Sequence, residues 1–212
     1  MASVISLNVV HAEIPDVGGS IGVTSIDKRP VADRREVTTD GVAGDQRSDM
    51  KHHGHTDHAV YAYGVEDYEW WSEQLGRELN AGVFGENLST VGVDWNAIQV
   101  GTVVRIGTAV LQVSTPRIPC GSFQRWLGED QWVKRFNEAG RWGTYLRVLE
   151  PGELGTGDEI IFESHPNHDV SITDIARVYT GARVEEQLKR VAACIDTPED
   201  TRIKAETALA NL

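Results

Sequence analysis

The stretch IQVGTVVRIGTAVLQV, residues 98–113, indicates a β fold. Its apolar side chains are mostly β-branched, and glycines at positions 101 and 107 divide it into pieces of strand length. Apolar runs at residues 145–149 and 159–162 continue the pattern, and residues 3–10 alternate apolar and polar side chains like a strand with one buried face. Many short strands with glycine turns predict a mainly β fold, a closed or nearly closed β-barrel.

Short helices are expected around the barrel. Tyr68, Trp71 and Leu75 fall on one helical face, and Gly76 supplies a stop, so residues 64–76 predict a helix whose aromatic side chains belong to the core. Residues 123–139 predict a helix or a covering loop. The glycine-rich and proline-containing residues 15–30 predict turns and short edge strands.

After residue 165 the sequence period changes to that of helices. Ser171 is a candidate N-cap, and Pro198 follows Thr197 at the start of a later helical pattern. Cys194 lies beside an apolar helical stripe and is expected to be a structural core residue. We therefore predict a β-barrel domain at 1–164 and a three-helix C-terminal unit at 165–212.

The segment STPRIPCGSF, residues 114–123, follows the longest strand-like run and carries the strongest chemical signal. Pro116 and Pro119 fix the backbone and remove amide donors, which predicts a stiffened loop. Cys120 follows, with Gly121 beside it and Arg117 three residues before it. A cation near a thiol favours the thiolate, which is the form that acts as a nucleophile or a soft metal ligand.

Composition limits the class of protein. The chain has 212 residues, of which 40% are hydrophobic and 25% charged, and its net charge is −12. We expect no nucleic-acid partner and no binding to anionic membranes, because this charge repels both. Two cysteines make no disulfide framework, and neither a signal-peptide pattern nor a membrane-spanning run is present, so a cytoplasmic location is expected.

Two motifs suggest other functions. His53, His55, Asp57 and His58 spell H-x-H-x-D-H, which resembles the zinc loop of metallo-β-lactamase-like hydrolases. The polar segment before the motif differs from the buried strand of that family, so a zinc hydrolase is a minor alternative. The segment from residue 171 resembles the first helix of a helix-turn-helix, but the tail holds six Lys/Arg against eight Asp/Glu, a net charge of 6 − 8 = −2. A DNA-binding module should instead be basic on one face.

Four segments, in order along the chain, resemble the MOSC family, the domain named after the C-terminus of molybdenum cofactor sulfurase. They are GDQRSD at 44–49 with the following residues 53–61, FGEN at 84–87, PRIPC at 116–120 and the segment 143–148. They cover about residues 40–160, and the helical tail is similar to that of the stand-alone bacterial branch. The resemblance implies a β-barrel whose single site cysteine is a molybdenum ligand or a persulfide carrier.

The resemblance also implies the site residues. Cys120 would be the catalytic cysteine and the ligand of molybdenum in the pterin cofactor. The cofactor-binding side chains would be Arg47, His53, Arg117 and Arg147, since guanidinium groups grip phosphate with paired hydrogen bonds. The residues that position the substrate or carry protons would be Asp57, Glu86 and Asn87.

The implied function is a molybdenum-cofactor-dependent oxidoreductase, because relatives in this family include amidoxime-reducing enzymes that act on small N-hydroxylated compounds. Two cysteines cannot build a four-cysteine iron–sulfur cluster and no flavin-binding glycine motif is present, so an external electron-donor protein is expected. A sulfur carrier with a persulfide on Cys120 and a non-catalytic cofactor-binding protein remain alternatives. We expect neither pyridoxal phosphate nor zinc as cofactor. The oligomeric state stays open, with a homodimer as one alternative.

Overall fold

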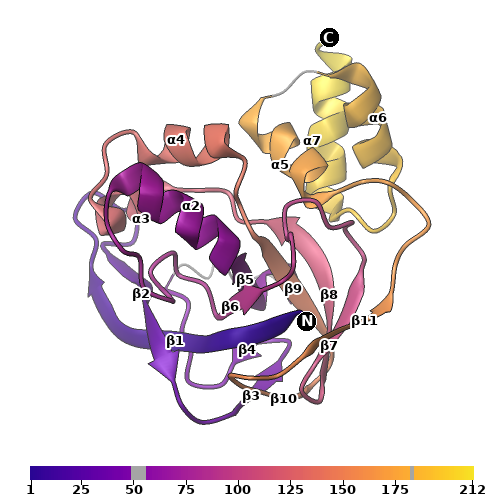
Figure 1. Cartoon of the computed structure of the whole chain (residues 1–212). Coiled ribbons are helices and arrows are strands. Elements are labelled where there is room, and N and C mark those ends of the chain that lie inside the picture. The colour runs from indigo at the N-terminus through magenta and orange to yellow at the C-terminus, as the bar shows by residue number, and fades with distance from the viewer. Residues whose placement is uncertain (49–55, 182–183) are drawn as a thin grey trace.

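The computed structural model describes residues 1–48, 56–181 and 184–212. Its strands are β1 (Ser3–Pro15), β2 (Val23–Val31), β3 (Arg35–Thr38), β4 (Gly41–Val42), β5 (Val60–Gly64), β6 (Leu88–Val91), β7 (Val103–Ile106), β8 (Ala109–Pro116), β9 (Thr144–Glu150), β10 (Gly152–Leu154) and β11 (Ile160–Ser164). Its helices are the 3-10 turn η1 (Thr56–His58), α2 (Val65–Leu75), α3 (Gly121–Leu127), α4 (Trp132–Ala139), α5 (Ile172–Thr180), α6 (Glu185–Ala193) and α7 (Glu199–Ala210). The prediction of a mainly β fold with several helices is confirmed (Figure 1).

Eight strands form one sheet in the order β11-β7-β8-β9-β5-β6-β1-β2. All neighbours in this sheet are antiparallel except β5 and β6, which are parallel because α2 crosses between them. A second sheet has the order β10-β3-β4. The strand β8 therefore lies inside the large sheet, and it delivers the loop that carries Cys120 from a position with strands on both sides.

The predicted barrel closure is not found among the described strands, since β11 and β2 end the sheet without pairing with each other. The start of the chain comes closest to closing it, through a single bridge between Ser3 and Glu159 and three backbone hydrogen bonds: Val4 amide to Asp158 carbonyl at 2.9 Å, Gly157 amide to Val4 carbonyl at 2.8 Å and Ile160 amide to Ala2 carbonyl at 2.9 Å. The strand β1 forms its regular pairing with other strands: its first part pairs with β6 and its later part with β2. Residues 15–30, predicted to form turns and short edge strands, contain most of β2, a nine-residue strand at the edge of the sheet.

An aromatic core fills the space between β5 and the helices α2, α3 and α4. Tyr68 and Trp71 are 5% and 1% exposed, which confirms the prediction that the aromatic face of α2 is core. The ring of Trp71 stacks on Phe136 of α4 at 5.7 Å, and Phe84 meets Phe123 of α3 at 5.3 Å. Such rings bury large areas with little loss of rotamer freedom. This cluster therefore holds α3, and with it Cys120, in a fixed place on the sheet.

The helices α5, α6 and α7 lie together at one end of the large sheet (Figure 1). Ser171 accepts a hydrogen bond from the Asp174 amide while the Asp174 carboxylate accepts one from the Ser171 amide, so the predicted N-cap is a reciprocal capping box. Residues 182 and 183 lie outside the described part of the chain. The three-helix unit and its boundary at residue 165 remain predictions. In the described ranges no helix is both long and apolar enough to cross a membrane.

Candidate functional site

Cys120 stands where β8 has ended and α3 begins. Its backbone is extended, with φ −128° and ψ 172°, as expected at an N-cap. The loop in the structure is shorter than the predicted one, because β8 continues to Pro116, which still pairs with Thr144 of β9. A Cβ at Gly121 would lie 2.9 Å from the Arg125 guanidinium, so a larger residue beside the thiol would displace that side chain. The half-buried sulfur is thus presented from a short, stiff connection.

The surroundings of the thiol favour its ionised form. Burial by itself raises the pKa of Cys120, but the positive charge of Arg117 and the amides of Phe123 and Ser122 at the start of α3 outweigh that effect, so the pKa of the thiol is lowered. Arg117 is only 6% exposed, and its guanidinium lies 4.2 Å from the centre of the Phe123 ring. The cation is therefore held in place by an aromatic face close to the sulfur.

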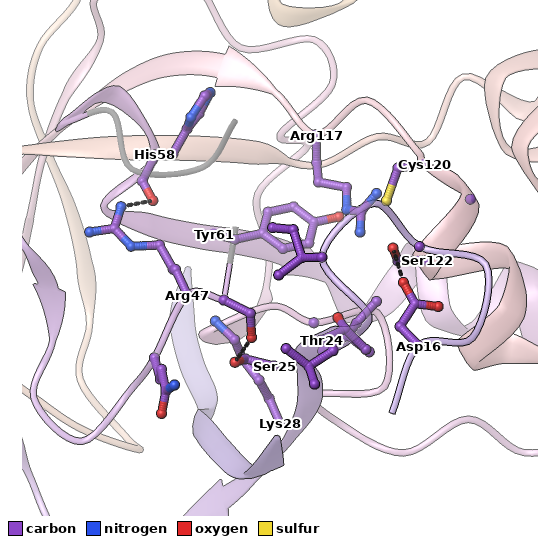
Figure 2. A pocket seen from close by; sticks show the side chains of 18 of the residues that line it. Asp16, Thr24, Ser25, Lys28, Arg47, His58, Tyr61, Arg117, Cys120 and Ser122 are labelled. Atoms are coloured by element: carbon purple, nitrogen blue, oxygen red, sulfur yellow. Dashed lines mark hydrogen bonds between the residues drawn. The ribbon is translucent and has the colours of Figure 1, made fainter. Parts of the chain in front are cut away.

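Cys120 and Arg117 both line a cavity of about 570 Å³ (Figure 2). This volume suits a small molecule or cofactor, which typically occupies a cleft of about 300–1,000 Å³. Its cationic side chains come from four separate parts of the chain: Lys28, Arg47, Arg117 and Arg125. Tyr61 and Tyr145 add aromatic faces to the wall. The cavity thus combines a thiol of lowered pKa with positively charged and apolar surfaces, which suits an anionic ligand.

Lys28 forms one buried ion pair of the wall. Its Nζ lies 2.6 Å from Oδ2 of Asp45, and the two side chains are 9% and 7% exposed. Asp45 also accepts hydrogen bonds from the Val10 amide and from Nδ2 of Asn87, each at 2.9 Å. Every donor around this carboxylate is therefore fixed, and Asn87 is tied to the same network. The pair orders the part of the wall formed by β1, β2 and the segment before residue 49.

Asp16 holds Arg125 at another part of the wall. The carboxylate accepts bonds from Nε and Nη2 of Arg125 at 2.6 and 2.9 Å, and from the Ser122 hydroxyl at 2.6 Å. The hydrogen bond from Arg125 lowers the pKa of Asp16, although burial acts in the opposite direction. Because Asp16 directly follows β1 while Ser122 and Arg125 belong to α3, this contact ties two distant parts of the chain together next to Cys120 (Figure 2).

The structure brings four of the predicted site residues to the cavity wall, namely Arg47, Asn87, Arg117 and Cys120. Arg47 donates to the Asp40 carbonyl at 2.6 Å and to the His58 carbonyl at 3.4 Å, so its guanidinium is oriented by backbone oxygens. Asn87 accepts from the Tyr61 amide at 3.1 Å. Predicted His53 lies outside the described residues.

Three predicted site residues lie away from the cavity wall. Arg147 has its Nε 2.9 Å from Oδ1 of Asp57, and this ion pair occupies both side chains. Glu86 is fully buried, and its Oε1 accepts from the Gly82 amide and the Ser89 hydroxyl, each at 2.6 Å. Burial raises the pKa of Glu86 despite these bonds. The geometry does not support a direct contact between these three residues and a ligand in the cavity. Their predicted roles remain untested.

The zinc-hydrolase motif is only partly within the described residues, since His53 and His55 fall outside them. Asp57 forms the ion pair with Arg147, and the His58 ring lies 4.7 Å from that of Tyr145. The described part of the motif is thus engaged with neighbouring side chains. It gives the zinc alternative no further support.

Several wall residues were not found from the sequence. Lys28 and Arg125 pair with carboxylates 17 and 109 residues away in the chain, so no local pattern announces them. A weaker signal existed for Asp45, which belongs to the GDQRSD segment. Tyr145 lies in the predicted strand 145–149, and its place on the wall follows only from the pairing of β9 with β5 and β8.

The fold and the thiol-bearing cavity together define a class of protein. The family model described as MOSC domain matches residues 49–161, which is more than half of the chain, and the chain therefore belongs to the MOSC domain family. This confirms the resemblance drawn from the sequence motifs.

Individual relatives agree with this assignment. The chain is 33% identical over 190 residues to the uncharacterized protein YflK of Bacillus subtilis, covering 89% of this chain and 86% of that protein. It is 31% identical over 162 residues to a protein named Reductase from Gibberella moniliformis, covering 74% of this chain and 28% of that longer protein. The crystal structure of YiiM from Geobacillus stearothermophilus superposes with a TM-score of 0.82 at 27% identity, covering 99% of this chain and 100% of that one.

Proposed function

We propose that the chain binds the molybdenum cofactor in the Cys120 cavity and acts as a reductase of small N-hydroxylated compounds, with Cys120 as the protein ligand of molybdenum. One observation carries the proposal: a thiol of lowered pKa lies beside Arg117 on the wall of a cavity of about 570 Å³. MOSC domains are associated with this cofactor, and a relative of the chain is named Reductase.

The donor set fits the cofactor. A metal held by a pterin dithiolene accepts a further thiolate, and Cys120 is the cysteine on the cavity wall. The pterin phosphate needs cationic donors, which Arg47 and Arg117 supply on the same wall. We leave Arg147 out of this donor set because Asp57 engages it. When bound, the cofactor supplies the oxygen-accepting redox chemistry.

The protein's own share is binding, orientation and charge. The charge of Arg117 helps to lower the pKa of the Cys120 thiol and thus favours the thiolate that a metal binds. The donors of Asn87 and Ser122 are engaged by Asp45 and Asp16, so these two wall residues would orient an N–OH group only by accepting its proton in a hydrogen bond to their side-chain oxygens. Tyr61 and Tyr145 offer apolar faces that limit the access of water.

The reaction N–OH + 2 e⁻ + 2 H⁺ → N–H + H₂O needs a source of electrons. The chain has two cysteines, too few for a four-cysteine cluster, and we propose that a separate electron-donor protein supplies them. The fungal relative named Reductase is much longer than the matched segment, which covers 28% of it.

A sulfur carrier is the second candidate, because a low thiol pKa equally suits a persulfide on Cys120. A non-catalytic cofactor-binding protein is the third. The three functions differ in metal content and turnover. A reductase contains molybdenum and turns over, a carrier holds sulfur without metal, and a binding protein holds the cofactor without turnover.

Metal analysis of protein made in a cofactor-producing host tests the proposal. We expect molybdenum near one atom per chain and reduction of an amidoxime by a chemical electron donor, both lost in Cys120→Ser. Cys194→Ser is the matched control, since this second thiol lies in the helical core away from the cavity. If the protein is free of molybdenum but carries a persulfide on Cys120, the reductase proposal is wrong and the sulfur carrier takes its place. Molybdenum without turnover would leave the binding protein.

A further inference from the structure

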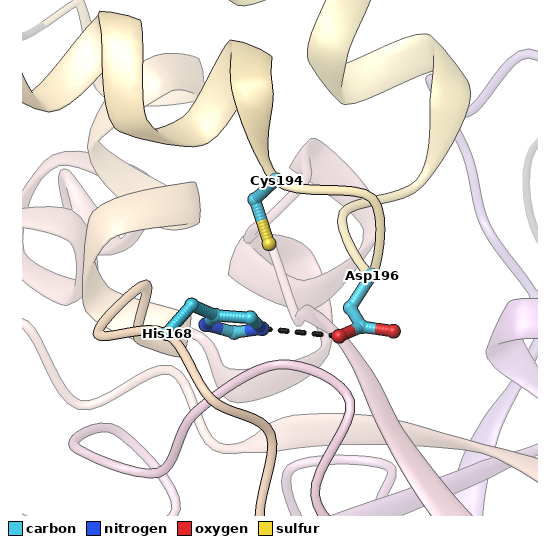
Figure 3. A group of neighbouring side chains, drawn as sticks. All are labelled: His168, Cys194 and Asp196. Carbon is cyan, nitrogen blue, oxygen red and sulfur yellow. Dashed lines mark hydrogen bonds and ion pairs between the residues drawn. The ribbon is translucent and has the colours of Figure 1, made fainter.

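Three potential metal ligands meet outside the Cys120 cavity. They are His168, which precedes α5, and Cys194 and Asp196, which follow α6 (Figure 3). One ligand atom from each lies within 4.8 Å of the others. Nε2 of His168 is 3.1 Å from Oδ2 of Asp196, and Figure 3 shows the sulfur of Cys194 pointing toward this pair. Imidazole, thiolate and carboxylate are the three side-chain groups that zinc prefers.

The spacing of these atoms suits a tetrahedral ion after a small contraction. Zinc bonds of about 2.0–2.3 Å place tetrahedral ligand atoms about 3.3–3.6 Å apart. Nε2 of His168 and Oδ2 of Asp196, at 3.1 Å, are slightly closer than this, and the three ligand atoms lie within 4.8 Å of one another. Three protein ligands leave a fourth position for water. The exposed fractions of the His168 and Asp196 side chains, 21% and 33%, allow solvent and an ion to reach the cluster.

The backbone around the cluster fixes two of the three ligands. Cys194 caps α6 with its amide bonded to the Val191 carbonyl at 3.4 Å, and its own carbonyl accepts from the Thr197 amide at 3.2 Å. Asp196 lies in this turn against Gly101, where an added Cβ would come within 2.7 Å of its carboxyl carbon. The carboxylate therefore has little freedom to turn away. Cys194 itself is buried, at 7% exposed, so its sulfur is shielded on the helical side.

We propose that His168, Cys194 and Asp196 bind one divalent cation of the zinc class, which joins the segment leading into α5 to the turn between α6 and α7. On binding, the Cys194 thiol releases its proton to solvent as the sulfur–metal bond forms. Nδ1 of His168 accepts from the Val170 amide at 3.2 Å in the metal-free protein, which leaves the ring proton on Nε2 facing Asp196. That proton moves to Nδ1 when Nε2 binds the metal, and the Val170 amide gives up this acceptor.

The site is distinct from the proposed molybdenum centre, and the two cysteines of the chain make them separable. In Cys120→Ser, any thiolate–metal charge-transfer absorption must come from Cys194. We would titrate this full-length variant with Co²⁺ in a thiol-free reductant, measure its absorption spectrum and then add Zn²⁺ as a competitor. The expected result is a tetrahedral Co²⁺ spectrum with a sulfur charge-transfer band at one equivalent, which Zn²⁺ removes.

Variants of the three proposed ligands test whether the sulfur charge-transfer band comes from this site. Adding Cys194→Ser should abolish it, and Asp196→Asn, which keeps the side-chain shape, should weaken Co²⁺ binding by about 10- to 100-fold. Circular dichroism confirms that each variant is folded. His53→Ala/His55→Ala in the Cys120→Ser background is the control for the other histidine-rich segment and should leave the band unchanged. The inference is overturned if no sulfur band forms in Cys120→Ser, or if Asp196→Asn and His168→Ala bind Co²⁺ as tightly as Cys120→Ser.

Discussion

Arg147 and Asp57 lie 2.9 Å apart as an ion pair, with side chains 29% and 12% exposed. The sequence placed both at the site, one as a phosphate-binding group and the other as a proton carrier. In the structure the pair instead joins β9 to η1 beside the cavity. The Ser114 hydroxyl also donates to the Asp57 carbonyl at 2.6 Å, so β8 is tied to the same turn.

Arg147→Gln should therefore reduce stability without changing the thiol. The loss of its cation leaves Asp57 buried and poorly compensated, and we expect the free energy of unfolding to fall by about 1–3 kcal/mol. Urea unfolding measures this change, and alkylation of Cys120 should proceed at the wild-type rate. Unchanged stability together with a loss of bound molybdenum would instead assign Arg147 to the cofactor phosphate.

Arg117→Gln should raise the pKa of the Cys120 thiol. Burial already opposes ionisation there, and without the guanidinium charge of Arg117 the thiolate is favoured only by the weaker effects of the Phe123 and Ser122 amides and of Arg125. The lowered pKa gives wild-type Cys120 a larger thiolate fraction than an ordinary thiol at the same pH. In a Cys194→Ser background, the rate of iodoacetamide alkylation at pH 7 should thus fall several-fold, and its pH profile should move to higher pH.

Arg117→Lys is the matched control for that experiment, because it keeps the charge but loses the planar group that lies on the Phe123 ring. Its pH profile should fall between those of the wild type and Arg117→Gln. An unshifted profile in Arg117→Gln would show that the start of α3 alone sets the thiol pKa.

Asp16→Asn should lower the melting temperature in a pH-dependent way. The hydrogen bond from Arg125 lowers the pKa of Asp16 in the folded protein, so its stabilising effect is present above the pKa of the unfolded carboxyl and is lost as the pH falls through the lower, folded value. We expect the variant to melt about 2–4 °C below the wild type at pH 7. The gap should close below about pH 4, near the ordinary carboxyl pKa. A gap that is constant from pH 7 to pH 3 would contradict this.

The parts of the site that the sequence revealed are those carried by short segments. Cys120 and Arg117 are three residues apart on one stiff connection, and Asn87 belongs to a loop punctuated by glycine. The cationic side chains of the cavity wall were not predicted, because Lys28 meets Asp45 and Arg125 meets Asp16 only after the strands have paired. A single sequence carries no local signal for such contacts.

The fold shows the same division. The N-cap at Ser171 and the aromatic face of α2 follow from local spacing, and both were predicted. The strand β2 is longer than the short edge strands predicted for residues 15–30, because its sequence holds charged residues and Pro30, which are typical of turns. This strand ends the sheet, and an edge position tolerates a proline that cannot donate to a neighbour. The extent of barrel closure was also overestimated, because the later half of β1 pairs with β2.

The ion pair between Lys28 and Asp45 should be the most sensitive polar contact of the cavity wall, because both side chains are more than nine-tenths buried. Lys28→Met removes the cation and leaves a buried carboxylate, which should lower the free energy of unfolding by about 3 kcal/mol. In an Asp45→Asn background the same substitution should cost less than half as much, since no charge is then left behind. A double-mutant cycle in urea measures this coupling. Equal costs in the two backgrounds would mean that Lys28 contributes through packing of its aliphatic stem rather than through its charge.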